Sequence, residues 1–245
     1  TLERMACGGM YDQLGGGFHR YSVDAEWLVP HFEKMLYDQA QFIRVYAHAA
    51  ALLDDPVYLQ VVEETIGYVL RDLRHPDGGF FSAEDADSPD EHGHGHEGLF
   101  HTWTIAEVIE VLDEDAPAAL DWYEFSLEGN FEGRTIPSRL VHRRELVRPP
   151  EVEHARQRLF EARERRPRPA LDDKVLTEWN AMMLSALAEA AALEAAFRAG
   201  CDGGSDGAPA QAGRPAGLRH LQPAGQRERG HYRSLQCRPR GLRAA

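Results

Sequence analysis

Cysteine pairs, membrane-length apolar runs and excess positive charge are all lacking in this 245-residue sequence. Its three cysteines, Cys7, Cys201 and Cys237, form no CxxC pair, which argues against a disulfide framework or a zinc–cysteine site and favours a cytoplasmic location. No apolar run approaches the roughly 18 residues of a membrane span, and no signal peptide opens the chain. The net charge of −13 argues against nucleic acid and anionic membrane surfaces as partners.

The two ends of the sequence differ from its body. An initiator methionine is lacking and residues 1–4 are typical of the middle of a helix, so we expect a fragment of a longer protein. Residues 198–245 hold nine arginines against three acidic residues, and no Val, Ile, Phe or Trp. Because such a segment cannot build a core, we predict one domain at 1–197 and a disordered tail at 198–245. The abrupt change inside a helical run favours a frameshifted or misassembled reading, with a natural basic tail as the alternative.

Helical periodicity dominates the body of the chain. Pro30 fits the first turn of a helix, and apolar residues from Phe32 to Ala50 follow it at helical spacing. Further patterns predict a helix that starts at Asp55–Pro56, a capping box at Thr104 and Glu107, a solvated outer helix at 151–166, a helix from Leu176, and short strand-like pieces near 80–82 and 99–103.

A weak internal repeat links two glycine-rich segments. The stretch "GGGFHRYSVD" at 15–24 has a counterpart in "GGFFSAEDAD" at 78–87, offset by 62 residues. Each has two glycines, an aromatic residue and a short run that ends in aspartate. Two helices and a loop occupy about that length, so the period fits stacked helical hairpins. Hairpins arranged in a ring would place these loops at one end, with their polar residues facing the centre.

The densest polar cluster is "VPHFEKMLYDQA" at 29–40. On a helix, His31, Lys34 and Asp38 would fall within about 60° of one another. Residues on such a border either line a cleft or form ion pairs at the edge of a core.

Carboxylates gather in "SAEDADS" at 82–88, which contains Glu84, Asp85 and Asp87. Such groups act as acid and base, bind sugar hydroxyls or hold a cation. They are also ordinary turn and cap residues.

The segment "LDDKVLTEWN" at 171–180 is typical of a helix entry. Its Asp173, Lys174, Trp179 and Asn180 could equally reach a polar pocket, in which tryptophan would offer a platform for a sugar ring.

Three histidines, His92, His94 and His96, alternate with glycine in "HGHGHEG". The spacing invites a metal interpretation, but this flexible loop supplies no groups that would pre-position the ligands. We therefore expect no metal and no cofactor.

Three segments together resemble the YyaL family, whose animal members include the spermatogenesis-associated thioredoxin-like proteins. They lie at 8–40, at 78–88 with "GLFHTWT" at 98–104, and at 172–188 ("DDKVLTEWNAMMLSALA"). The resemblance implies a thioredoxin-like domain followed by an (α/α)6 toroid of the six-hairpin glycosidase type, similar to N-acylglucosamine 2-epimerase and cellobiose epimerase. This chain would then be an all-α partial toroid with short β-hairpins in its connecting loops, and the upstream thioredoxin-like domain would be its partner in the intact protein.

Two classes of function fit these residues. The first is a carbohydrate enzyme in the intact protein, either an epimerase with bases on two faces of a sugar carbon or a glycosidase with two carboxylates about 5–10 Å apart. The second is a non-catalytic module that binds a ligand or a protein, and an incomplete toroid would leave the fragment inactive and aggregation-prone. For the enzyme we predict as catalytic His19, Arg20, His31, Lys34, Glu84, Asp85 and Asp87, and as substrate-binding Asp24, Asp38, Trp103, Asp173, Lys174, Trp179 and Asn180.

Overall fold

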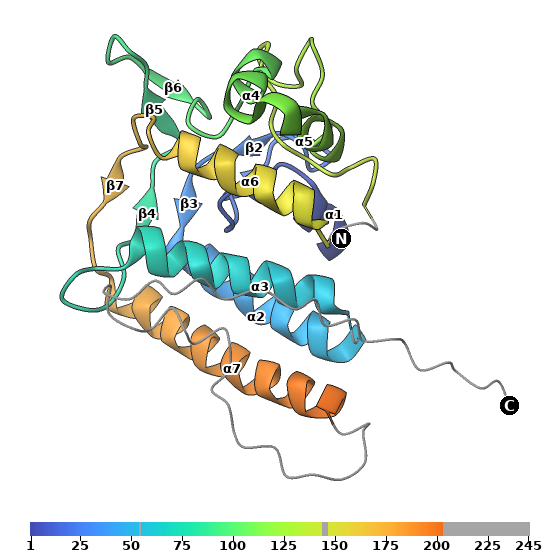
Figure 1. Cartoon of the computed structure of the whole chain (residues 1–245). Helices are drawn as coiled ribbons and strands as arrows, with labels where there is room; N and C mark the ends of the chain where they lie inside the picture. Colours follow the sequence, from blue (N-terminus) through green and yellow to red (C-terminus); the bar gives the residue numbers. More distant parts are fainter. Residues whose placement is uncertain (54, 144–146, 203–245) are drawn as a thin grey trace, which may run out of the picture.

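Helices make up about half of the chain, with a few short strands at one end of them (Figure 1). The computed structural model describes residues 1–53, 55–143 and 147–202, with side chains as far as 195. The helices are α1 (Leu2–Cys7), α2 (Leu36–Leu53), α3 (Pro56–Tyr68), the π-helical turn η1 (Val69–Leu73), α4 (Ile105–Leu112), the 3-10 turn η2 (Asp113–Asp115), α5 (Ala116–Trp122), α6 (Pro150–Arg163) and α7 (Thr177–Asp202). The strands are β1 (Tyr21–Ser22), β2 (Pro30–His31), β3 (Lys34–Met35), β4 (Ala83–Glu84), β5 (Asp87–Pro89), β6 (Gly95–Glu97) and β7 (Leu171–Asp172).

The first core lies in the helical layer of α2, α3 and α7, where α2 packs between the other two helices (Figure 1). The predicted helix start at Asp55 is confirmed, because its carboxylate accepts a hydrogen bond from the Val57 amide at 3.0 Å. The faces that meet are apolar and include Ile43, Val62 and Met183, all almost fully buried. Burial of these faces, rather than helix propensity, stabilises the layer.

The second core joins α4, α5 and α6. Thr104 and Glu107 cap α4 reciprocally, which confirms the predicted capping box. The predicted outer helix at 151–166 is observed as α6, although one stripe of it is buried. Val152 and Leu159 on that stripe pack against α4 and α5, so α6 is solvated only on its other face.

The predicted start of α2 at Pro30 is wrong. Pro30 and His31 form β2, which pairs antiparallel with β1. Lys34 lies in β3, which joins β4 and β7 in a three-stranded sheet of order β3-β4-β7. Residues 30–35 have helical periodicity in the sequence, but their backbone groups pair with other strands in these two sheets. The helix α2 therefore begins only at Leu36. His31, Lys34 and Asp38 therefore do not share a helical face.

The two glycine-rich segments adopt the same turn. Both glycines of each pair have positive φ: 75° and 78° in the first pair, at 16–17, and 103° and 81° in the second, at 78–79. The aromatic residue that follows each pair, Phe18 or Phe80, forms an isolated antiparallel bridge with a residue upstream.

A side-chain amide then clamps each of these aromatic residues by its backbone. Gln39 accepts from the Phe18 N–H at 2.8 Å and donates to the Phe18 carbonyl at 2.7 Å. Asn180 does the same for Phe80, at 2.7 and 3.0 Å. Gln39 and Asn180 are each the fourth residue of their helix, α2 and α7. The repeat is therefore one of local structure as well as of sequence.

The backbone of α7 is helical as far as Asp202, and the rest of the predicted tail at 198–245 lies outside the described residues. No helix in the described ranges is both long and apolar enough to cross a membrane.

Candidate functional site

A cluster of polar side chains forms where the β1–β2 hairpin meets the β5–β6 hairpin. We define this surface cluster as Arg20, His31, Glu33 and Glu97. The His31 Nδ1 lies 2.7 Å from the Glu97 Oε1, and its Nε2 lies 3.8 Å from the Glu33 Oε2. The Arg20 guanidinium donates to Glu33 at 2.7 Å. The His31 and Glu33 side chains are 28% and 25% exposed, so the cluster is open to a ligand.

The contact between His31 and Glu97 sets the tautomer of the imidazole. A carboxylate at Nδ1 favours the tautomer that carries its proton there, which leaves the lone pair on Nε2. The Tyr21 ring stacks on the imidazole, with ring centroids 5.1 Å apart, and holds its plane. This arrangement orients a partly exposed histidine to accept a proton from a ligand, with its positive charge then balanced by Glu97.

Asp38, in the first turn of α2, faces the same charges. Burial raises the pKa of its carboxyl to about 6, an effect that Arg20 opposes and Glu33 adds to. Its Oδ2 has no hydrogen-bond partner among the described residues. The carboxyl group thus titrates close to neutral pH, which suits a proton donor or acceptor.

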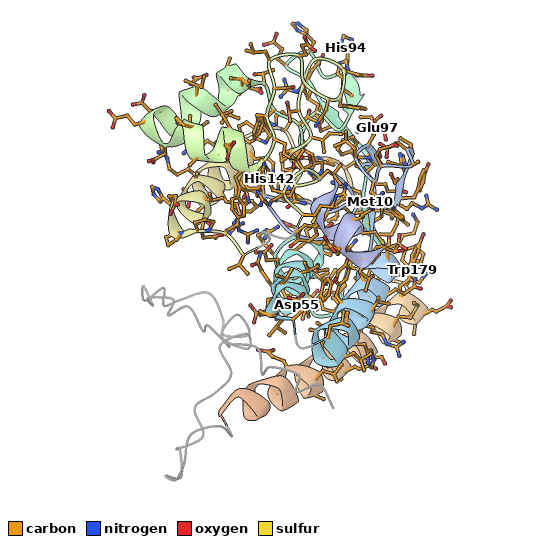
Figure 2. All side chains as sticks on the ribbon, turned by 90° about the vertical axis from the view of Figure 1, so that its right-hand side faces the viewer. Met10, Asp55, His94, Glu97, His142 and Trp179 are labelled. Carbon is orange, nitrogen blue, oxygen red and sulfur yellow. The ribbon has the colours of Figure 1, made fainter. Side chains whose placement is uncertain are left out.

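The aromatic pair Tyr37 and Trp179 joins the starts of α2 and α7, with ring centroids 4.8 Å apart in an edge-to-face contact. A hydrogen bond to Glu33 and one to Tyr37 raise the pKa of Arg20, which ties the aromatic pair to the surface cluster. Figure 2 shows Glu97 and Trp179 on the right-hand side of the view, with His142 nearer the left.

A second cluster, which we call the buried cluster, lies inside the molecule around the Asp12 carboxylate. Lys34 donates to it at 2.8 Å, Arg163 at 2.8 and 2.9 Å, and the His101 Nδ1 lies 3.6 Å away, too far for a full hydrogen bond. Burial alone would raise the pKa of Asp12, but Arg163 and Lys34 outweigh it and hold that pKa well below its usual value. The cluster ties the first glycine loop, β3 and α6 together.

His19 belongs to the buried cluster and not to the surface. Its Nδ1 lies 2.8 Å from the Phe32 carbonyl, and its ring meets the His101 ring edge to face at 4.6 Å. Burial and the neighbouring His101 lower the pKa of His19 well below its usual value. With 2% of the residue exposed, His19 has no access to a ligand in this structure.

Glu84 is also buried, directly opposite Lys34 in the β3–β4 register. The Tyr68 hydroxyl donates to it at 2.7 Å, and Arg168 at 3.2 Å. These bonds satisfy the carboxylate internally.

The other two carboxylates of that segment, Asp85 and Asp87, are exposed. Asp87 is the register partner of Glu97 in the β5–β6 hairpin, so it borders the surface cluster. Asp85 accepts from the Asp87 amide at 3.2 Å, as a turn residue does.

The remaining sequence-predicted residues mostly hold the scaffold. Asp24 accepts backbone amides at 2.6–3.1 Å and closes the turn between β1 and β2, and Asn180 clamps Phe80. Trp103 is buried under the Arg166 guanidinium, 3.7 Å from its ring centroid. Lys174 pairs with Asp172 at 2.8 Å on the surface, beside the exposed Asp173.

The histidine-rich segment forms the tip of the β5–β6 hairpin. Within the part of the chain that the structure describes, no group of three or more His, Cys, Asp or Glu side chains is placed to hold a metal ion. His96 instead lies 3.1 Å from Asp90, whose carboxylate also accepts the amides of His92 and His94.

The sequence prediction missed Glu33, Glu97, Asp12, His101 and Arg163. Glu33 stands two residues after His31, and an acidic residue so close to a histidine in the sequence was a usable signal for an ion pair. Glu97 stands in the histidine segment, where the metal interpretation obscured it. No local signal marks Arg163, because its partner is 151 residues away along the chain.

No family model matches the chain. The chain is 39% identical to spermatogenesis-associated protein 20 of Mus musculus over 218 residues, and 40% identical to the protein of that name from Rattus norvegicus over 220 residues. An uncharacterised protein of Caenorhabditis elegans is 34% identical over 221 residues. The first two matches cover 77–78% of this chain but 28% of each relative, so the chain spans under a third of the length of these relatives. The named homologues support the family of spermatogenesis-associated protein 20.

Proposed function

We infer that the chain is a segment of a protein of the spermatogenesis-associated protein 20 family, and we propose that the surface cluster binds a carbohydrate. His31 acts there as a general base on a sugar carbon next to a carbonyl. The observation that carries this proposal is the partly exposed imidazole, held at Nδ1 by Glu97 at 2.7 Å. Its charged neighbours suit epimerase or isomerase chemistry.

Proton transfer to His31 would leave an enolate-type charge on the substrate. Arg20 is the nearest side-chain cation of the cluster, and its guanidinium supplies the positive charge that stabilises such an oxyanion. Glu97 balances the imidazolium that forms. Asp38, which titrates near pH 6, is the proposed proton donor. Return of its proton to the opposite face of the same carbon completes an epimerisation, and proton exchange with solvent then restores His31 and Asp38.

A glycosidase mechanism is less well supported. It needs two carboxylates across the scissile bond, one of them protonated. Glu84 is buried and fully hydrogen-bonded to Tyr68 and Arg168, so it does not reach a ligand in this structure. Asp85 and Asp87 are exposed, and Glu84, the buried carboxylate next to them in the sequence, is held by Tyr68 and Arg168.

In the intact protein we propose that α2, α3 and α7 form one sector of an (α/α)6 toroid, next to a thioredoxin-like domain. The repeated amide clamp supports this, because it places the start of α7 against its glycine loop as it places the start of α2. A role in carbohydrate metabolism and a cytoplasmic location belong to the same proposal. A non-catalytic ligand- or protein-binding module is the second candidate, favoured by the burial of His19 and Lys34.

Solvent isotope exchange tests the proposed function. The intact parent protein is incubated with aldoses and ketoses in deuterated water, and loss of the proton next to the carbonyl is followed by NMR. We expect exchange with at least one sugar, and a drop of about 10²–10⁴-fold for His31→Gln. Glu91→Gln, at an exposed carboxylate on the tip of the neighbouring β5–β6 hairpin, serves as the control. Exchange that survives intact in His31→Gln contradicts the role of His31.

A further inference from the structure

A groove of about 350 Å³ lies between α2 and α7. Ala40 on α2, and Ala181 and Ser185 on α7, are the small residues that leave this space open, and Met182 forms part of its wall. The volume is at the lower end of the range found for small-molecule sites. It is therefore large enough for a compact ligand and too small for a folded partner.

The polar side chains of the groove are suited to hydroxyl groups. Neither the Ser185 hydroxyl nor the Glu178 carboxylate makes a hydrogen bond within the described ranges. The Arg44 guanidinium is already paired with Glu189 at 2.5 Å. The groove thus offers hydrogen-bonding groups over an apolar floor, and its only lining cation in the described chain is neutralised. That combination fits an uncharged hydroxylated ligand better than a phosphorylated one.

The groove begins about one helical turn along α2 from Tyr37. Tyr37, Gln41 and Arg44 follow one another at helical spacing, and the Gln41 amide donates to the Tyr37 carbonyl at 3.4 Å. Tyr37 interacts with Arg20 of the surface cluster and with Trp179 at the start of α7. Through this aromatic pair, the groove is a neighbour of the surface cluster.

We propose that the α2–α7 groove is a subsite for a neutral sugar unit, so that the ligand of this protein is an oligosaccharide with its reacting end at His31. This inference rests on the proposed function. An extended ligand explains why the loop end and the groove are linked by an aromatic pair. The face of an aromatic ring offers a broad apolar surface against which the C–H face of a sugar can pack.

Ligands of different length test the groove separately from the reacting end at His31, because only a longer saccharide would reach the groove. Binding of glucose and N-acetylglucosamine to the intact parent protein is compared with that of their β-1,4-linked trisaccharides, by calorimetry and by the ¹³C shift of the Met182 methyl group. We expect a trisaccharide to bind at least about tenfold more tightly than its monosaccharide. Only the trisaccharide should shift Met182, while the buried Met10 and Met183 stay unchanged.

Filling the groove provides the decisive variant. Ala181→Trp should reduce trisaccharide affinity about tenfold and leave monosaccharide affinity within twofold. Ala191→Trp, on the exposed surface of the same helix outside the groove, is the matched control for folding. Equal affinities of mono- and trisaccharide, or an unchanged trisaccharide affinity in Ala181→Trp, overturn the subsite. If neither saccharide binds, the subsite is overturned, and the proposed function itself is refuted when the isotope-exchange assay also detects exchange with no sugar.

Discussion

Acidification should destabilise this chain through two buried histidines, His19 and His101. Burial lowers the pKa of His101 to about 3, and that of His19 well below the ordinary value of 6.5. The His101 ring is therefore neutral in the folded chain at pH 5, whereas in the unfolded chain it binds a proton. The lowered pKa of His19 acts in the same direction. Stability rises with pH wherever the unfolded state binds more protons. The contribution is thus fully present above pH 6.5 and is lost as the pH falls toward the folded pKa.

The loss of stability on acidification depends on the difference between the pKa of a histidine in the unfolded chain and its pKa in the folded chain. Below pH 6.5, each buried neutral histidine removes about 1.4 kcal/mol per pH unit from the free energy of unfolding. Between pH 7 and pH 5 this amounts to about 2 kcal/mol for His101. His19 adds to the loss in the same direction, and because the two rings lie 4.6 Å apart the two contributions are not strictly additive. A loss of about 2 kcal/mol is already a large part of a typical domain's 5–15 kcal/mol.

Urea unfolding followed by circular dichroism at pH 7 and pH 5 measures this loss. The His101→Gln variant cannot titrate at that position, so its loss between the two pH values should be about 2 kcal/mol smaller than that of the unmodified chain. His92→Gln, at an exposed histidine, should behave like the unmodified chain. An identical pH dependence in the unmodified chain and in His101→Gln would refute the reasoning.

Three further changes address the scaffold, each measured by chemical denaturation. Lys34→Met leaves its buried carboxylate partner short of one cation and should cost about 3–5 kcal/mol. Gln39→Leu removes both hydrogen bonds to the Phe18 backbone inside the core and should cost about 2–4 kcal/mol, while Gln39→Glu, which keeps only the acceptor, should recover part of it. Gly17→Ala should cost at least about 1–3 kcal/mol, because φ is +78° and its Cβ would lie 2.6 Å from the Tyr68 ring; an unchanged midpoint would show that the turn relaxes.

The helices could be predicted from local sequence, but the start of α2 could not. The Asp55 cap, the capping box and the apolar stripes each act within a few residues, and each is observed. The segment from Pro30 to Met35 has helical periodicity too, yet it forms β2 and β3. Its strand partners lie at 21–22 and at 83–84, and such distant pairing does not show in the periodicity of a single segment.

Only part of the candidate site could be predicted from the sequence, because its residues are also brought together by pairing between distant segments. Arg20 and His31 were identified by residue type, and both lie in the surface cluster. The residues that give them their geometry, Glu33 and Glu97, reach them across hairpins. His19 and Lys34 share the residue types of catalytic groups, but they lie in the buried cluster, where His19 packs against His101 and Lys34 against the Tyr68 ring. Sequence shows which groups exist, whereas their access to solvent depends on remote packing.

The first glycine turn and its amide clamp also affect the surface cluster, because Arg20 follows them directly in the chain. The positive φ values of Gly16 and Gly17 turn the chain so that both backbone polar groups of Phe18 face Gln39. Arg20 follows two residues after Phe18, and its amide donates to the Glu33 carbonyl at 2.8 Å. The backbone position of Arg20 therefore depends on how the clamp holds Phe18. The Arg20 guanidinium is thus positioned through the backbone as well as by its own contact with Glu33. Loss of the clamp in Gln39→Leu should therefore loosen the Arg20–Glu33 pair as well as the core, which an exposed-arginine change such as Arg74→Gln would not do.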